Sequence, residues 1–196
     1  HSATMVAAGV YLLARIFPVF ELSNTAKDLV LYIGAFTALA AAFVAVTRID
    51  FKRLLAWSTI SQLGEMFFVL GLGGALAAVF HLAAHAVFKS ALFLVAGAVS
   101  HSTGTRNLDE LGGLAKKMPV LFAVFLISAL SLAGFPPFAG FWSEEEILAD
   151  AFGKNLLPGL FMLSLIFLAG VYISRAGFLI FGNWKGMKEH SIKKLS

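Results

Sequence analysis

Long apolar runs recur along the whole chain, separated by short segments rich in polar residues, glycine and proline. Most runs are about 17–25 residues long, the length of a helix that crosses the roughly 30 Å hydrocarbon core of a bilayer. The pattern therefore predicts an all-α, polytopic membrane protein. Its first helix is expected to end near Arg15 and Pro18, because proline interrupts helices. The expected helices cover residues 3–17, 28–47, 54–72, 75–100, 119–150 and 157–181.

The span 119–150 is interrupted in its middle. An apolar run from Pro119 to Ala133 meets Gly134-Phe135-Pro136-Pro137 and then continues to Leu148. Pro136 and Pro137 cannot continue a helical hydrogen-bond ladder, so either two helices meet here in a hairpin or one span is broken within the membrane. A break at membrane depth is tolerated only where the freed backbone lines a cavity or is buried in protein, which makes it a pointer to function.

The distribution of Lys and Arg favours the broken span. If 119–150 crosses the membrane once, the basic residues concentrate on one side, as the cytoplasmic or matrix face requires. A hairpin would move the basic tail 182–196 to the opposite side. We therefore expect an integral protein of a prokaryotic cell membrane or an organellar inner membrane. One side holds only Arg15, Lys27 and Lys154, and the other holds Arg48, Lys52, Arg53, Arg106, Lys116, Lys117, Lys185, Lys188, Lys193 and Lys194.

Composition supports the membrane assignment and excludes several other classes. Hydrophobic residues make up 59% and charged residues 13% of the chain, whereas soluble domains are about 45–50% apolar. The net charge of +4 comes from residues spread over loops, so no nucleic-acid partner is expected. Cysteine is absent, which excludes disulfides, Fe–S clusters and cysteine zinc sites within this segment. The chain begins at His1 without a Met, as expected of a piece of a longer protein.

Three ionisable residues at spacings of four lie within the apolar run 75–100. His81, His85 and Lys89 therefore line one face of the helix over roughly 12 Å. Ionisable groups in membranes cost several kcal/mol and usually mark ion pathways, and the ordinary histidine pKa of about 6.5 suits proton relay. Alternatively, Lys89 reaches the interface or forms a static ion pair, and the histidines only hydrogen-bond between helices. A metal site is disfavoured because the next residue along the stripe is a cation.

Carboxylates accompany this stripe on two neighbouring spans. Glu65 lies in 54–72 among Ser58, Thr59, Ser61 and Gln62, so this helix needs protein or water on its polar face. Its position relative to the Gly71–Gly74 turn puts Glu65 nearer the level of the histidines than of Lys89. It serves either the ion pathway or a lone interhelical hydrogen bond. Glu144, Glu145 and Glu146 follow the helix break and point about 100° apart, so at most two face one pathway. A solvated helix start is the alternative, and it suits Glu145 and Glu146 better than Glu144. Lys52, Arg53, Arg106 and Arg175 are interpreted as topology anchors.

With these residues in view, the chain resembles the antiporter-like, proton-pumping membrane subunits of respiratory complex I (NADH:quinone oxidoreductase). Related multisubunit Na+/H+ antiporters and membrane-bound hydrogenases share the pattern. The resemblance covers essentially the whole chain in order. Its matching segments are 1–11, 50–64, the helix with His81, His85 and Lys89, 111–119 and 133–144.

The resemblance implies a fold of two inverted five-helix repeats, each with one discontinuous helix. Residues 1–20 would be the last helix of the first repeat, 28–181 the whole second repeat, and 182–196 a polar basic tail. Lys89 matches the central lysine of the proton path, His81 and His85 its relay, Glu144 the terminal ionisable position, and His1 a relay position on the linking helix. Many complex I members carry lysine in place of Glu144 and tyrosine in place of Glu65, so the subunit type stays open and Glu65 is an additional acid.

The implied function is proton translocation as a subunit of a redox-driven complex. The enzyme would be the whole NADH:quinone oxidoreductase-type complex, because this chain carries no visible redox, cofactor or metal site. The implied partners are other membrane subunits, the lipid bilayer and H+, or Na+ in an antiporter that uses Glu144 or Glu65. A structural scaffold, in which the polar stripe only holds helices together, is the alternative from another class. The first half of the path lies outside this chain, which alone is not expected to pump.

Overall fold

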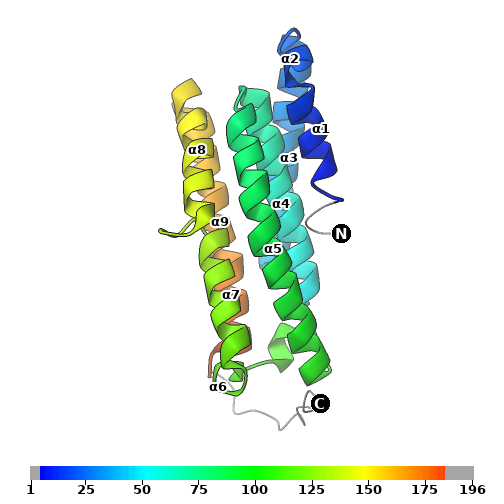
Figure 1. Cartoon of the computed structure of the whole chain (residues 1–196), viewed down its shortest axis with the longest axis vertical. Coiled ribbons are helices and arrows are strands. Elements are labelled where there is room, and N and C mark those ends of the chain that lie inside the picture. The colour runs from blue at the N-terminus through cyan, green and yellow to red at the C-terminus, as the bar shows by residue number, and fades with distance from the viewer. Residues whose placement is uncertain (1–4, 184–196) are drawn as a thin grey trace.

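Four long helices run roughly parallel to the long axis of the molecule (Figure 1). The structure, a computed structural model, describes residues 5–183. Within that range these four helices are long and apolar enough to cross a membrane, and no strand forms beyond an isolated bridge between Asp50 and Asn107. The predicted all-α, polytopic membrane fold is confirmed. The long helices are α3 (Asn24–Thr47), α4 (Phe51–Leu72), α5 (Ala75–Thr103) and α9 (Leu156–Phe181).

The remaining span is discontinuous, as predicted. Helices α7 (Pro119–Leu132) and α8 (Ala139–Lys154) lie end to end, with the connecting loop projecting between them (Figure 1). Gly134 has φ +64°, and the Phe135 N–H donates to the Leu130 carbonyl at 2.9 Å, which closes α7 in a left-handed glycine cap. Pro136 and Pro137 follow in the loop, where they have no N–H to donate. Residues 119–154 thus form two half-helices in line, an arrangement that fits one broken span better than a hairpin.

The two ends of the bundle differ in charge. The short helix α6 (Leu114–Lys117) lies at the lower end in Figure 1. The short helix η1 (Leu108–Glu110) is joined to the turn between α3 and α4, where the Leu108 N–H donates to the Ile49 carbonyl at 2.8 Å. The upper end carries Arg15, Lys27 and Lys154, whereas the lower end carries Arg48, Lys52, Arg53, Arg106, Lys116 and Lys117. The described residues therefore agree with the predicted topology. The tail lysines from Lys185 onward lie outside the described residues.

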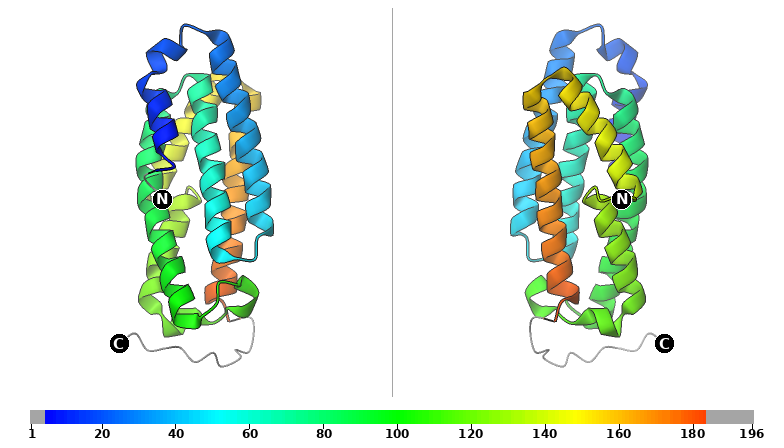
Figure 2. Two further views of the ribbon diagram at one scale, coloured as in Figure 1. Left: turned by 90° about the vertical axis from the view of Figure 1, so that its right-hand side faces the viewer. Right: turned by 90° about the vertical axis from the view of Figure 1, so that its left-hand side faces the viewer.

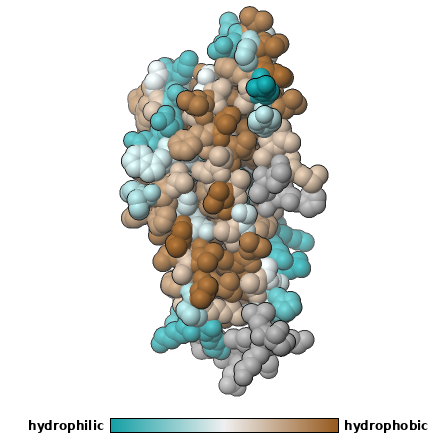
Figure 3. All heavy atoms as spheres, viewed as in Figure 1, coloured by the Kyte–Doolittle hydropathy of each residue, from teal (hydrophilic) through white to brown (hydrophobic). Residues whose placement is uncertain are grey.

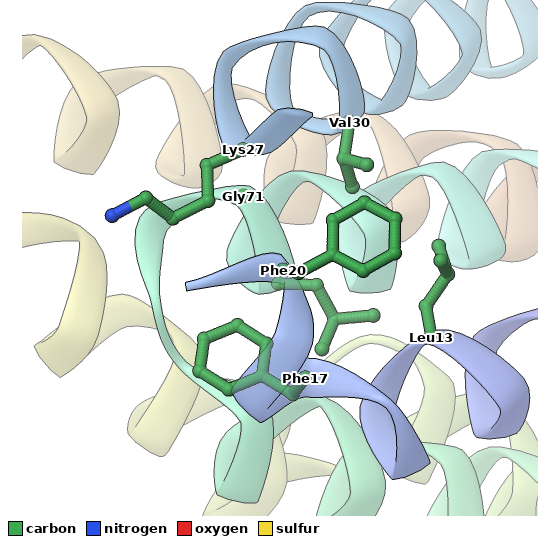
Figure 4. A pocket seen from close by; sticks show the side chains of 7 residues that line it. Leu13, Phe17, Phe20, Lys27, Val30 and Gly71 are labelled. Carbon is green, nitrogen blue, oxygen red and sulfur yellow. The ribbon is translucent and has the colours of Figure 1, made fainter. Parts of the chain in front are cut away.

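The N-terminal segment differs from its expected form. It consists of α1 (Ala8–Arg15) and a separate short α2 (Phe17–Phe20). The first helix ends at Arg15, as expected. Pro18, however, lies in the first turn of α2, where its missing N–H is not needed. The segment packs on the upper ends of α3 and α4 around an apolar cavity of about 10 Å³, from which the Lys27 ammonium points away (Figure 4).

Close backbone contact joins α3 to α4. A Cβ on Gly64 would lie 2.5 Å from the Ala38 nitrogen, and one on Gly34 would lie 2.8 Å from the Gly64 carbonyl oxygen. Real Cβ atoms do not approach backbone so closely, so only glycine fits at either position. The Ser61 hydroxyl adds a hydrogen bond to the Ala38 carbonyl at 2.9 Å. Small residues allow this contact between spans, as in membrane helix pairs generally.

Arg175, predicted to be a topology anchor, ties α9 to the end of α3. Its Nη1 atom donates to the carbonyl oxygens of Val46 and Arg48, both at 2.8 Å. These carbonyls belong to the last turn and C-cap of α3, where no helical N–H remains to pair with them. The guanidinium also lies at the negative end of the helix dipole. This cation therefore has a structural role at the lower end of the bundle.

Candidate functional site

The three residues of the predicted stripe on α5 are all buried inside the protein. His81 and Lys89 are 0% exposed and His85 is 1% exposed. Lys89 therefore does not extend to the membrane interface, which was one of the alternatives from sequence. Exposed apolar residues of the same helix, such as Val87 and Leu94, occupy the opposite side. The face of α5 with the three ionisable groups packs against α4, α7 and α8.

Lys89 is held by a hydroxyl on α4. Its Nζ atom donates to the Ser58 Oγ at 2.5 Å, and the Ser58 hydroxyl donates in turn to the Leu55 carbonyl at 2.9 Å. Among the described residues Lys89 forms no direct ion pair, so the static-pair alternative does not apply. Glu65, two turns further along α4, still lies close enough for electrostatic interaction with Lys89. This agrees with the offset expected from the α4–α5 turn.

His81 is connected to the start of α8. Its Nδ1 atom lies 2.9 Å from the Ser143 Oγ, and the Ser143 hydroxyl donates to the Gly140 carbonyl at 3.0 Å. A serine hydroxyl has one proton to donate, so it accepts from His81, whose proton is thereby assigned to Nδ1. The Nε2 atom of His81 then presents a lone pair. It has no hydrogen-bond partner within residues 5–183.

His85 lies between these two groups. The His81 and His85 ring centroids are 6.3 Å apart, and Phe88 contacts the His85 ring edge-on at 5.5 Å. Neither ring nitrogen of His85 has a hydrogen-bond partner in the described part of the chain, although both are buried. The three ionisable side chains of α5 thus follow one another along its buried face, from Lys89 through His85 to His81.

The helix break selects Glu144 from the three successive carboxylates. Glu144 is buried, whereas Glu145 and Glu146 are exposed. Helical side chains lean toward the N-terminus of their helix, and the Glu144 carboxylate accordingly lies against Gly134, where any Cβ would collide with it. Neither carboxylate oxygen has a partner among the described residues. The break therefore creates the space that this side chain occupies.

The polar face predicted for 54–72 faces the interior of the protein. Glu65 is 2% exposed and lies within electrostatic range of both Lys89 and Glu144. The Gln62 amide is buried, and neither its oxygen nor its nitrogen has a partner in the described range. Lipid is therefore excluded from this face, as expected. All five polar side chains of the face are buried: Ser58, Thr59, Ser61, Gln62 and Glu65.

Tyr172 on α9 is a buried polar residue that sequence reasoning missed. Its side chain is 0% exposed, and it lies near Ser58, Glu65 and Glu144, yet no hydrogen bond within residues 5–183 satisfies its hydroxyl. A single tyrosine in an apolar run gives no periodic signal. Ser143 was also missed, because a single serine beside three glutamates gives no signal of its own. His1, the remaining predicted site residue, lies outside the described residues.

Most of the buried side-chain donors and acceptors without a partner among residues 5–183 thus lie in one interior region. The exceptions are Arg48 Nε and Ser102 Oγ. Burying an unpaired polar group costs roughly 2–7 kcal/mol, and ordered water ordinarily satisfies such groups. The ionisable groups of this region can hold protons on imidazole, ammonium, carboxyl and phenol groups. The atoms of this region that lack a partner belong to Gln62, His81, His85, Glu144 and Tyr172.

Residues 2–174 match the family described as "NADH:quinone oxidoreductase/Mrp antiporter, TM". The chloroplastic NAD(P)H-quinone oxidoreductase subunit 5 of Chaetosphaeridium globosum is 48% identical over 190 residues, which are 92% of this chain and 28% of that protein. NAD(P)H-quinone oxidoreductase chain 5 of Picosynechococcus sp. is 42% identical over 205 residues, 100% of this chain and 31% of the relative. The chain thus spans less than a third of these relatives.

The fold is also similar to that of a solved structure of the Mrp complex from Dietzia sp. The TM-score is 0.86 at 26% sequence identity, and the match covers 100% of this chain and 39% of the other. The similarity therefore extends over the discontinuous span as well as the four long helices. Together with the sequence matches, it places this chain in the NADH:quinone oxidoreductase/Mrp antiporter family of transmembrane proteins.

Proposed function

We propose that this chain carries protons through a membrane as part of an antiporter-like subunit of an NADH:quinone oxidoreductase-type complex. The main evidence is the buried row of Lys89, His85 and His81, which leads toward Ser143 and Glu144 at the helix break. The names of the similar proteins support the redox-driven complex over other assemblies. The chain itself contributes the translocating part, and its partners would be the other membrane subunits.

Proton movement along the row follows from its spacing. Successive groups on α5 are four residues apart, a rise of about 6 Å, which one water molecule or a side-chain rotation bridges. Lys89 accepts a proton at one end and passes it through His85 to the lone pair on His81 Nε2. Glu144 receives it at the break. Ser143 holds the His81 ring and its tautomer in place, which is a positioning role.

Electrostatic coupling gives the row a way to respond to a distant event. Glu65 interacts with both Lys89 and Glu144, so a change in its charge alters proton affinity at both ends of the row. Interacting sites of this kind titrate as a group. A charge change arriving from a neighbouring subunit would then shift protons along the row, which is coupling in the thermodynamic sense. Tyr172 would connect Glu65 and Glu144 as a neutral donor.

We also propose that the chain contains parts of two inverted repeats. Residues 1–20 would be the last helix of the first repeat, and 28–181 the second repeat, with α7 and α8 as its broken helix. His1 would then link the row to the half-path in the preceding part of the protein.

A Na+/H+ antiporter is the second candidate. The likeness to the Mrp complex favours it, and so do the two unpaired oxygens of Glu144, because carboxylate oxygens are ligands for hard cations. Sodium-dependent proton transport in vesicles without an electron donor would select this candidate. If proton transport requires electron transfer and sodium has no effect on it, the subunit belongs to a redox-driven complex.

Replacing Lys89 by Met should abolish proton translocation while the complex still assembles. The apolar side chain keeps a similar length but cannot hold a proton, so we expect pumping in reconstituted vesicles to fall at least tenfold. Ser90→Ala, on the exposed side of the same helix, is the matched control and should pump normally. Normal pumping by an assembled Lys89→Met complex would refute the path, and loss of assembly would favour the scaffold alternative.

Replacing Glu144 by Gln should also reduce pumping at least tenfold. The amide preserves the shape and polarity at the break but does not exchange a proton at working pH. Glu146→Gln removes the same charge from the exposed side of α8 and should leave the rate within a factor of two. Equal loss in the two variants would show that general charge on α8, and not the buried carboxylate, matters.

Tyr172→Phe removes only a buried hydroxyl, and we expect a several-fold lower pumping rate with unchanged assembly. Tyr32→Phe, an exposed position on α3, is the control for loss of a tyrosine hydroxyl in a membrane span. The ratio of protons translocated to quinone reduced is the measurement. An unchanged ratio in Tyr172→Phe would remove this residue from the path.

A further inference from the structure

An open groove of about 390 Å³ lies between α7 and α9, below the helix break. The right-hand view of Figure 2 shows α7 and α9 side by side in the lower half of the bundle. Of the twelve residues that line the groove, Ser174 alone has a polar side chain. Leu126 and Phe178 on its walls are largely exposed. The groove therefore suits an apolar occupant from outside the described chain.

The length of the groove fits an acyl chain of one lipid leaflet. The groove extends along α7 from Phe122 to Ala133, a rise of about 16 Å, close to the roughly 15 Å depth of half a hydrocarbon core. An acyl chain of the lower leaflet therefore matches the groove in length.

The lower end of the groove lies beside two lysines. Gly182 lines that end, and its carbonyl accepts from the Gly113 N–H at 2.8 Å, which fixes α6 directly below α9. Lys116 and Lys117 of α6 are exposed and precede the lining residue Phe122 by only a few residues. Their ammonium groups belong to the basic end of the bundle, at the depth of lipid headgroups.

We propose that the groove binds one anionic phospholipid, with an acyl chain between α7 and α9 and the headgroup phosphate at Lys116 and Lys117. Basic residues at the cytoplasmic or matrix ends of helices attract anionic headgroups at about 1 kcal/mol per charge. The acyl chain fills the space beside α7, a half-helix that lacks the support of a continuous span. This site steadies the lower half-helix and is independent of the proton row. Figure 3 shows that brown, hydrophobic residues dominate the lower part of the face seen in Figure 1, with hydrophilic residues below them.

The test measures binding of phosphatidylglycerol to the delipidated full complex, with phosphatidylcholine as the zwitterionic comparison. Ser174→Phe fills the groove from an exposed position and should abolish one phosphatidylglycerol site in native mass spectra. Ser164→Phe, equally exposed on α9 outside the groove, should retain the site. The double variant Lys116→Gln/Lys117→Gln should weaken binding about 30-fold, whereas Lys52→Gln/Arg53→Gln, at the same end, should not.

Several outcomes would overturn the proposal. Undiminished phosphatidylglycerol binding in Ser174→Phe would remove the acyl chain from the groove. Equal binding of phosphatidylcholine, or no effect of the α6 variants, would remove the headgroup site. If inorganic phosphate displaced phosphatidylglycerol completely, the site would consist of the two lysines alone, without a bound acyl chain. A density map of the complex with a protein segment in the groove would replace the lipid altogether.

Discussion

The hydrocarbon core of a bilayer has no water to solvate a buried charge. The protein itself must therefore solvate Lys89, and the rest of the structure depends on how it does so. The ammonium lies in the interior with a serine hydroxyl as its direct partner. A cation in such a place is stable only if surrounding groups solvate it. Glu65 and the polar face of α4 supply part of that environment from the neighbouring helix. The same face excludes lipid, so the charge and its surroundings form one buried unit.

The discontinuous helix extends this unit to a second charged group. A continuous helix through 119–150 would pack against α5 along its whole length and leave no space for a side chain at the position of the break. The break instead ends α7 at a glycine with positive φ and restarts α8 where the Gly140 N–H donates to the Ser131 hydroxyl at 3.1 Å. Glu144 and Ser143 are thereby turned toward the interior. The unusual backbone and the buried carboxylate are consequences of the same local geometry.

The sequence predicted the spans and the break because both depend on local properties. Apolar run length determines which helices cross the membrane, and Pro136 and Pro137 end a helix wherever they occur. The spacing of His81, His85 and Lys89 likewise placed them on one face without knowledge of any neighbour. The end of the first helix at Arg15 was also predictable, but the short α2 after it was not, because proline ends one helix and fits the first turn of another equally well.

The contacts between helices could not be predicted in this way. Ser58 as the partner of Lys89 depends on the register of α4 against α5, which periodicity leaves open. The choice of Glu144 over Glu145 depends on the rotation at which α8 restarts. Tyr172 became part of the site only through packing, because a lone tyrosine in an apolar span is ordinarily an interfacial residue.

Ordered water decides whether the buried polar residues from Lys89 to Glu144 form a single proton path. It can be seen in a density map of the full complex at sufficient resolution. We expect waters hydrogen-bonded to His85, to His81 Nε2 and to the Glu144 carboxylate, forming an unbroken chain from Lys89 to the helix break. Dry apolar packing around these atoms in every functional state of the complex would contradict it.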